Sequence, residues 1–327
     1  MEFVKDKVAE VKKSLDKIHE KDPMLVYTFA LIGAGYVGFK LLKDIRGMLR
    51  YTVRPSYDLK KRYGSNWCVV TGATDGIGKG FAFELSRRGM KVVLVARNDE
   101  KLQAVAKEIN ETYEGAETKT IVFDFNQNYT SEVIKELTEK FDEIEKCSIL
   151  VNNVGVLFAG MHGDMEDDGV MTTLNINITA NTLMAKIFIP KLLANETRAG
   201  MVNVGGYLSY FPCPFLTVYS ASKAYMTQFS TSLSEEYKHK IDILVTNSGS
   251  IKTNMNDGRF LFTITPAQHA NAVLNKLGHD TWTCGHAIHA VHQYLLEKPI
   301  EGAIIKYINN KRFESYFTAQ QEQADAN

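Results

Sequence analysis

The feature that most constrains the fold of this chain is a regular alternation of short apolar segments with helical ones. The runs with strand composition lie at 67–70, 91–96, 120–124, 148–152, 200–205 and 241–247, and helical stretches separate them. Strands that alternate with helices favour a parallel sheet covered on both faces. The sequence therefore predicts an α/β fold with a doubly wound parallel sheet, whose ligands bind at the carboxyl ends of the strands.

A glycine-rich turn follows the first predicted strand. Residues 71–78 read Thr-Gly-Ala-Thr-Asp-Gly-Ile-Gly and run directly into a helical segment. Glycines let the backbone turn sharply and approach a pyrophosphate, whose charge is favoured at a helix N-terminus. The turn predicts a dinucleotide site with the candidate residues Gly72, Thr74, Asp75, Gly76, Ile77 and Gly78.

A second match to the glycine pattern lies upstream, at 33–38. It is followed by a basic segment and Pro55, and no second apolar strand of the right length comes after it. The pattern has meaning only within a strand–helix–strand unit, so we reject this match.

The end of the second strand indicates which dinucleotide binds. Folds that select NAD(H) place an acidic residue there to hold the ribose hydroxyl. This chain has Arg97 instead, and a guanidinium suits a 2′-phosphate. The sequence therefore predicts NADP(H) as the cofactor.

Tyr219 and Lys223 form a candidate acid–base pair in a helical stretch. Residues four apart share one helix face. A phenol with a pKa near ~10 works at neutral pH only where a nearby cation favours the phenolate. Chance also produces such pairs on amphipathic helices, so the other motifs decide the interpretation.

Taken together, the motifs resemble the short-chain dehydrogenase/reductase family over about residues 64–299. The matching positions are the glycine turn, Asp124, the stretch 152–155, Asn177, Tyr219 and Lys223. Residues 73–78 and the hydrophobic segment before 58–64 are similar to the membrane-bound 17β-hydroxysteroid dehydrogenase / very-long-chain 3-oxoacyl-CoA reductase group. This resemblance implies a Rossmann-type fold and NADPH-dependent reduction of a lipid-like ketone. The group also includes a hydroxysteroid dehydrogenase-like branch regarded as inactive.

The resemblance also implies roles for single residues. Tyr219 would donate the proton, Lys223 would hold the ribose and lower the phenol pKa, and Asn177 would bend its helix and relay protons. A structural hydrogen-bonding role for Asn152 and Asn177 stays open. The cofactor residues that the resemblance adds are Asp124, Asn153, Gly155, Gly249, Ile251 and Thr253.

Two departures from the family pattern bear on activity. Gly206 stands where the family has a Ser, thirteen residues before the Tyr, and glycine offers no side-chain donor to the substrate oxygen. Losing such a donor costs about 10²–10³ in kcat. Tyr207 or Ser209 would replace it only if the loop refolded. Ser248 replaces a Pro near the nicotinamide, which predicts a more flexible turn.

The N-terminal 63 residues differ from the rest. Residues 1–22 form an amphipathic pattern suited to a partner or a membrane surface. Residues 23–42 are almost free of charge and predict a transmembrane helix, with burial against another protein as the alternative. A basic linker is expected at 43–63, and a C-terminal helix with a polar tail at 300–327.

Composition excludes some functions. The 38 basic and 38 acidic residues balance, so nothing favours nucleic acid as a partner. The four cysteines have no metal-ligand spacing, so we expect reduced thiols and no metal site. The resemblance implies the endoplasmic reticulum membrane, with the mitochondrial inner membrane as an alternative.

Two functions remain open at this point. The first is a cofactor-binding relative with a degraded catalytic site, kept as a structural or assembly subunit of a membrane complex. Gly206, Ser248 and the helix at 1–22 favour it. The second is an active, membrane-anchored NADPH-dependent reductase of 3-oxoacyl-CoA or steroid ketones. Either protein would act as a homodimer or within a larger assembly.

Overall fold

The computed structural model describes residues 2–52, 55–256, 258, 262–296 and the single residues 307, 311 and 315. It divides into two compact units, Met1–Arg54 and Pro55–Asn327, which are described separately. The predicted C-terminal helix and tail at 300–327 lie outside the described residues, apart from those three positions.

The N-terminal unit consists of two helices, α1 (Glu2–Lys21) and α2 (Pro23–Thr52). Asp22 caps α2, because its Oδ1 accepts a hydrogen bond from the Leu25 N–H at 3.1 Å. The segment Pro23–Gly47 is long and apolar enough to cross a membrane, and none of its hydrophobic window is packed inside the structure. Helix α2 continues through 43–52, which the sequence had suggested as part of a linker.

The second unit, which we call the sheet unit (55–327), is built on seven parallel strands in the order β3-β2-β1-β4-β5-β6-β7. The predicted doubly wound α/β fold is confirmed, and the strand order reverses between β1 and β4. The strands are β1 (Trp67–Thr71), β2 (Lys91–Ala96), β3 (Thr118–Val122), β4 (Cys147–Asn152), β5 (Ala199–Val204), β6 (Ile241–Thr246) and β7 (Trp282–Thr283).

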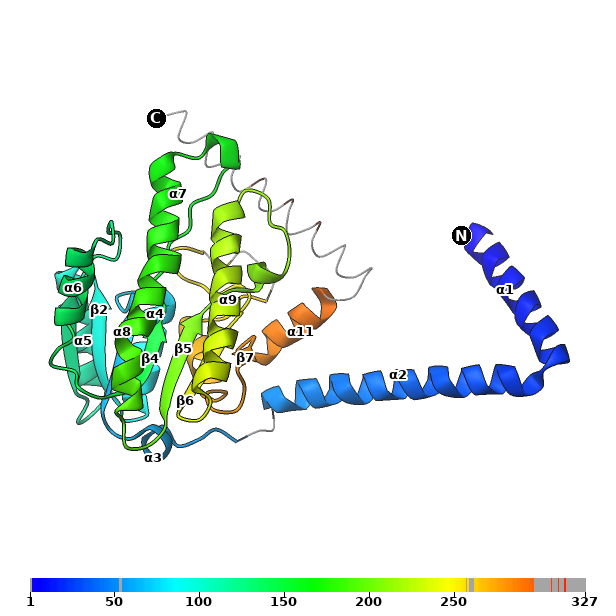
Figure 1. Cartoon of the computed structure of the whole chain (residues 1–327), viewed down its shortest axis with the longest axis horizontal. Coiled ribbons are helices and arrows are strands. Elements are labelled where there is room, and N and C mark those ends of the chain that lie inside the picture. Colours follow the sequence, from blue (N-terminus) through cyan, green and yellow to red (C-terminus); the bar gives the residue numbers. More distant parts are fainter. Residues whose placement is uncertain are drawn as a thin grey trace. The chain divides into compact units, whose positions relative to one another are not determined.

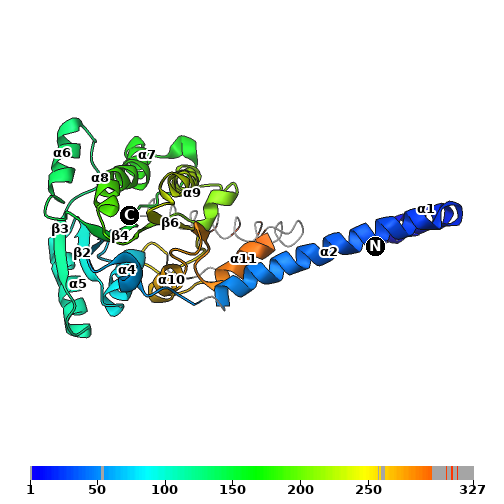
Figure 2. The same cartoon turned by 60° about the horizontal axis from the view of Figure 1, so that its bottom comes forward.

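Helices cover both faces of this sheet, as Figures 1 and 2 show. One face carries α4 (Gly76–Arg87), α5 (Asp99–Thr112) and α10 (Pro266–Leu274), with a core that includes Phe81, Leu102 and Val273. The other face carries α6 (Ser131–Glu139), α8 (Asn181–Leu193) and α9 (Thr217–Tyr237), with a core that includes Leu137, Phe188 and Leu233. The apolar strands are therefore buried from both sides, which explains their continuous hydrophobic runs.

The long predicted helix 170–194 is not α-helical throughout. It runs as α7 (Asp167–Leu174), a π-helical turn η2 (Asn175–Ala180) and then α8. A π turn inserts an extra residue into the helical ladder and is frequent at functional sites. The remaining elements are α3 (Leu59–Tyr63), η1 (His162–Asp164), η3 (Tyr207–Tyr210) and α11 (Ala287–Leu296).

An ionic cluster around Asp242 links the segment before β1 to the amino end of β6. The Asp242 carboxylate accepts from Arg62 Nε at 2.7 Å, Arg198 Nη2 at 2.7 Å and the Tyr63 hydroxyl at 3.0 Å. Burial alone would raise the pKa of Asp242, but these hydrogen bonds lower it. The cluster lies at the opposite end of β6 from the loop that follows the strand, so it stabilises the fold and leaves the carboxyl ends free.

Candidate active site

A cavity of about 750 Å³ lies at the carboxyl ends of β1, β4, β5 and β6. The glycine turn, the loops after β4, β5 and β6, and the start of α9 line it, so it lies where the parallel sheet was expected to bind its ligand. The predicted residues that line it are Gly72, Thr74, Asp75, Gly76, Ile77, Asn153, Gly155, Tyr219, Lys223, Gly249, Ile251 and Thr253.

The glycine turn has the geometry of a phosphate cradle. Gly72 and Gly76 have φ angles of +65° and +51°, which other residues rarely adopt. A Cβ atom on Gly78 would lie 2.2 Å from the Gly72 carbonyl oxygen, so only glycine fits there. The side chain of Asp75 makes no capping hydrogen bond with α4. These features fit a pyrophosphate at a helix N-terminus.

Asn153 holds the turn in place. Its Nδ2 donates to the carbonyl oxygens of Thr71 at 2.9 Å and Gly72 at 3.3 Å, and its backbone N–H donates to Thr71 Oγ1. The loop after β4 is thereby tied to the turn after β1. Asn153 therefore shapes the cradle through the backbone atoms that it binds.

Arg97 and Asp124 do not line the cavity but follow the carboxyl ends of the neighbouring strands. Arg97 comes directly after β2 and is exposed. Asp124 comes two residues after β3, and its Oδ1 accepts from the Asn126 N–H at 3.0 Å. Both positions lie at the carboxyl edge of the sheet, where a doubly wound fold is expected to hold the adenosine half of a dinucleotide.

Asn177 is buried inside the π turn and joins the loop after β4 to helix α9. Its Oδ1 accepts from the Val156 N–H at 2.8 Å, and its Nδ2 donates to the Val156 carbonyl at 3.0 Å and to Ser222 Oγ at 3.1 Å. The helix is π-helical at this position, from Asn175 to Ala180. These bonds use both the oxygen and the nitrogen of the side-chain amide as a link between backbone and side-chain groups, which favours the structural role that the sequence had left open.

Tyr219 and Lys223 lie on the same face of α9, and Lys223 Nζ is 5.5 Å from the centre of the Tyr219 ring. Lys223 is 6% exposed and donates to the Val204 carbonyl at 3.1 Å. Burial lowers the pKa of Lys223 to about 8 and raises the pKa of Tyr219 to about 12. The expected lowering of the phenol pKa was therefore wrong for this structure, because burial dominates and the amine lies over the ring.

Gly206 leaves an unfilled place beside Lys223. Its φ of 177° is extended backbone that any residue adopts, and a Cβ atom there would lie 3.6 Å from Lys223 Cγ, an ordinary contact. Its N–H donates to Asn247 Oδ1 at 3.1 Å. The backbone expected for a serine is thus present, and the hydroxyl is missing.

The two residues considered as replacements for that hydroxyl lie in different places. Tyr207 lines the cavity. Ser209 is not among the cavity-lining residues, and its Oγ is buried without a hydrogen-bond partner among the described residues.

Ser248 is held more firmly than its replacement of a proline suggested. Its Oγ donates to the Cys284 carbonyl at 2.9 Å and lies 2.7 Å from Thr246 Oγ1 and 3.1 Å from His269 Nδ1. These contacts do not support the expected looser turn. Sequence reasoning missed His269, which also lines the cavity, because no local pattern links it to position 248.

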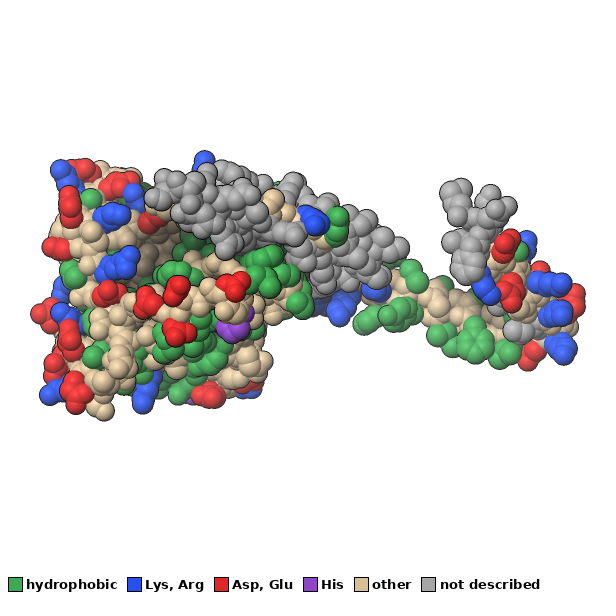
Figure 3. Space-filling view, turned by 90° about the horizontal axis from the view of Figure 1, so that it is seen from above, with side chains coloured by type: hydrophobic (Ala, Val, Ile, Leu, Met, Phe, Trp, Pro, Cys, Tyr) green, Lys and Arg blue, Asp and Glu red, His purple; other side chains and the backbone are tan. Residues whose placement is uncertain are grey.

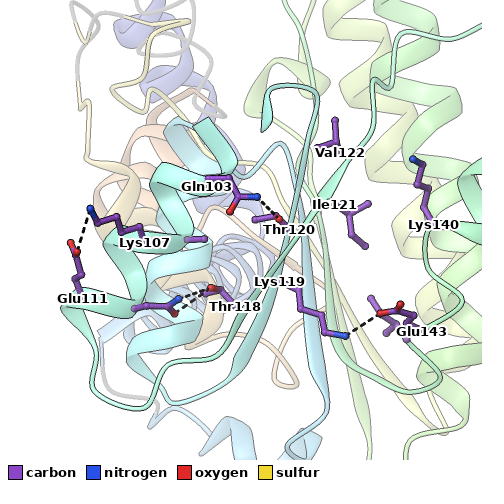
Figure 4. A pocket seen from close by; sticks show the side chains of 13 residues that line it. Gln103, Lys107, Glu111, Thr118, Lys119, Thr120, Ile121, Val122, Lys140 and Glu143 are labelled. Carbon is purple, nitrogen blue, oxygen red and sulfur yellow. Dashed lines mark hydrogen bonds and ion pairs between the residues drawn. The ribbon is translucent and has the colours of Figure 1, made fainter. Parts of the chain in front are cut away.

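A second hollow, of about 900 Å³, lies at the edge of the sheet between α5, β3 and residues 140–144 (Figure 4). Its polar side chains pair with one another, as in Gln103 with Thr120 at 3.0 Å and Lys119 with Glu143 at 3.3 Å. None of the motif residues lines it. The cavity at the carboxyl ends is therefore the better candidate site.

The surface around the carboxyl ends is mixed in character. Figure 3, seen from above the view of Figure 1, shows hydrophobic side chains beside acidic ones on this face. Within the described part of the chain, no group of three or more His, Cys, Asp or Glu is placed to hold a metal ion.

Residues 66–261 match the model of the short chain dehydrogenase family. A very-long-chain 3-oxoacyl-CoA reductase of Caenorhabditis elegans is 35% identical over 282 residues, covering 82% of this chain and 88% of the relative. The inactive hydroxysteroid dehydrogenase-like protein 1 of Homo sapiens is 34% identical over 288 residues, covering 82% and 86%. This chain therefore belongs to the short-chain dehydrogenase family.

Solved structures agree on the fold. A short-chain dehydrogenase of Shigella flexneri complexed with NADP has a TM-score of 0.60 at 24% identity, covering 67% of this chain and 95% of that one. A short-chain dehydrogenase of Sphingobium yanoikuyae in complex with NADPH has a TM-score of 0.59 at 24% identity, covering 64% and 84%.

Proposed function

We propose that this short-chain dehydrogenase binds NADP(H) in the cavity at the carboxyl ends of its strands and reduces ketones slowly at most. Its main role is then that of a cofactor-binding subunit in a membrane assembly. The observation that carries this proposal is Gly206, which places no hydroxyl beside Lys223 where the family has a serine.

The residues present fit the cofactor. The cradle formed by Gly72, Gly76 and Gly78 suits its pyrophosphate, and Arg97 would pair with its 2′-phosphate. Thr253 borders the same cavity next to Gly76, since a Cβ atom on that glycine would lie 2.9 Å from Thr253 Cγ2. NADPH supplies a hydride when bound. Two structurally similar proteins are described with NADP or NADPH, which supports the assignment.

The protein side chains retain part of the reductase chemistry. With a pKa of about 12, Tyr219 keeps its proton at neutral pH and can donate it to a carbonyl oxygen. What the site lacks at position 206 is the second donor, which would stabilise charge as it develops on that oxygen. Losing one such donor lowers kcat by about 10²–10³.

Membrane attachment is the second part of the proposal. Helix α2 has the length and composition of a single span, and the helix α1 before it is amphipathic. We place the protein at an intracellular membrane, where the sheet unit would be held beside partner subunits or a second copy.

An active reductase of lipid-like ketones is the second candidate function. Leu157, Leu208, Leu216 and Met255 give the cavity an apolar lining that suits an acyl chain or a steroid. Tyr219 and Lys223 are retained, and the very-long-chain 3-oxoacyl-CoA reductases are among the relatives.

The test combines binding and turnover in one sample of the full chain in mild detergent. Fluorescence titration should show NADPH binding tighter than NADH. Initial rates with NADPH and a long-chain 3-oxoacyl-CoA should stay below about 0.1 per second, well under typical enzymes. Rapid reduction would favour the second candidate, and no binding of either nucleotide would contradict both.

A further inference from the structure

Tyr207 follows Gly206 directly, and its backbone is anchored by a hydrogen bond. It is the first residue of η3, and its backbone N–H donates to the Ser248 carbonyl at 3.1 Å. The loop after β5 is thereby joined to the loop after β6. Its side chain lines the same cavity as Tyr219 and Lys223.

The ring of Tyr207 is held by aromatic neighbours. Its centre lies 5.4 Å from that of Phe211 in an edge-to-face arrangement and 5.5 Å from that of His292. Leu208 and Leu216 belong to the same small apolar cluster. The hydroxyl, by contrast, has no hydrogen-bond partner among the residues that the structure describes.

The Tyr207 hydroxyl also remains a donor at ordinary pH. Burial raises its pKa above the usual value, and the nearby Cys213 and Tyr219 raise it further. Tyr207 and Tyr219 both pack against the apolar cluster of Leu208, Cys213 and Leu216 and line the same cavity, so the two phenols lie near each other. The buried side-chain atoms that lack a partner do not include the Tyr207 hydroxyl, so solvent reaches this hydroxyl. A donor on the wall of a cavity that solvent reaches can hydrogen-bond a ligand that enters.

We propose that the Tyr207 hydroxyl donates a hydrogen bond to the carbonyl oxygen of the substrate, in place of the side chain missing at position 206. Tyr219 would supply the proton, and Tyr207 would stabilise the developing charge from a second direction. This inference rests on the proposed function, because it assigns whatever ketone reduction the site retains to a second phenol.

The test measures NADPH-dependent reduction of a long-chain 3-oxoacyl-CoA by the full chain in mild detergent. Tyr207→Phe keeps the ring and its packing but removes the donor, so turnover should fall at least tenfold while the Kd for NADPH stays unchanged. In the Gly206→Ser variant a serine hydroxyl is available as a donor. Adding Tyr207→Phe to that variant should then lower turnover by less than about threefold.

Two further variants distinguish a catalytic role from a structural one. Ser209→Ala removes a hydroxyl that does not line the cavity, so it should leave turnover unchanged. Tyr207→His keeps an N–H donor on an aromatic ring and should retain more turnover than Tyr207→Phe.

Three results would overturn the proposal. In the first, the wild type and Tyr207→Phe have equal turnover. In the second, Tyr207→His and Tyr207→Phe lose turnover equally. In the third, the wild type has no turnover while the Gly206→Ser variant does. Failure of the wild type to bind NADPH would instead contradict the proposed function, so the two failures are distinguishable.

Discussion

After β5, the two neighbouring glycines differ in the space that they leave for a side chain. A Cβ atom on Gly206 would make an ordinary contact with Lys223, whereas one on Gly205 would lie 2.1 Å from Asn247 Oδ1. Asn247 is buried and also accepts from the Thr227 hydroxyl at 3.1 Å, so it cannot move aside freely. A serine is therefore allowed at one position and excluded at the next.

This difference predicts that Gly205→Ser destabilises the protein and Gly206→Ser does not. Overpacking at Gly205 should cost about 1–3 kcal/mol of the free energy of unfolding. Denaturant unfolding of both variants in detergent measures the difference. Equal unfolding midpoints for the two variants would show that the Asn247 side chain moves aside at little cost in free energy.

At the scale of elements, α11 contacts the loop after β6, which lines the cavity. His289 on this helix contacts the carbonyl oxygens of Ser250 and Phe262 through Nε2, each at 3.1 Å. It also lies against Gly249, where a Cβ atom would be 3.1 Å from His289 Cδ2. The ring therefore joins the loop after β6 to the segment that follows it.

The burial of His289 predicts a pH dependence of stability. Burial lowers its pKa to about 4, although hydrogen bonds to the Phe262 and Ser250 carbonyls oppose this. The unfolded chain then binds more protons between about pH 6.5 and 4, so stability falls as the pH falls through that window.

His289→Gln removes this titration and keeps an N–H donor. Between pH 6.5 and 4, the free energy of unfolding should fall by up to about 3 kcal/mol more for the wild type than for the variant. Denaturant unfolding at each pH measures this difference. Parallel curves for the two proteins would mean that His289 is protonated as easily in the folded state as in the unfolded one.

The sequence predicted the elements whose pattern lies within a short window of residues. It did not predict the features that depend on residues far apart in the chain. Six strands and the glycine turn were found because apolar runs and glycine spacing are readable in short windows. Strand β7 was missed because it has only two residues, Trp282–Thr283. The bonds around Ser248 come from α10 and from Cys284, and no local pattern connects positions so far apart.

At the scale of the whole molecule, the chain combines a Rossmann-type sheet unit with two N-terminal helices. Such a sheet supports many functions, so the fold does not decide between a reductase and a cofactor-binding subunit. The proposed membrane attachment is through the N-terminal unit and depends on helix α2.

We predict that arginines in the middle of α2 release the full chain from membranes. Leu31 and Val37 are 77% and 56% exposed, and each change to arginine at a span centre costs about 2.5–3.5 kcal/mol of insertion. The Leu31→Arg/Val37→Arg variant should leave the carbonate-resistant membrane fraction, with Lys12→Arg in α1 as the matched control. Unchanged membrane retention would mean that α2 packs against protein.

The most direct test of the central claim is the turnover gained when the missing hydroxyl is restored. At saturating NADPH and 3-oxoacyl-CoA, Gly206→Ser should raise kcat at least tenfold, and by up to about 10²–10³, without changing the Kd for NADPH. Equal kcat values for the wild type and Gly206→Ser would show that Gly206 does not limit the chemistry, and would contradict the account.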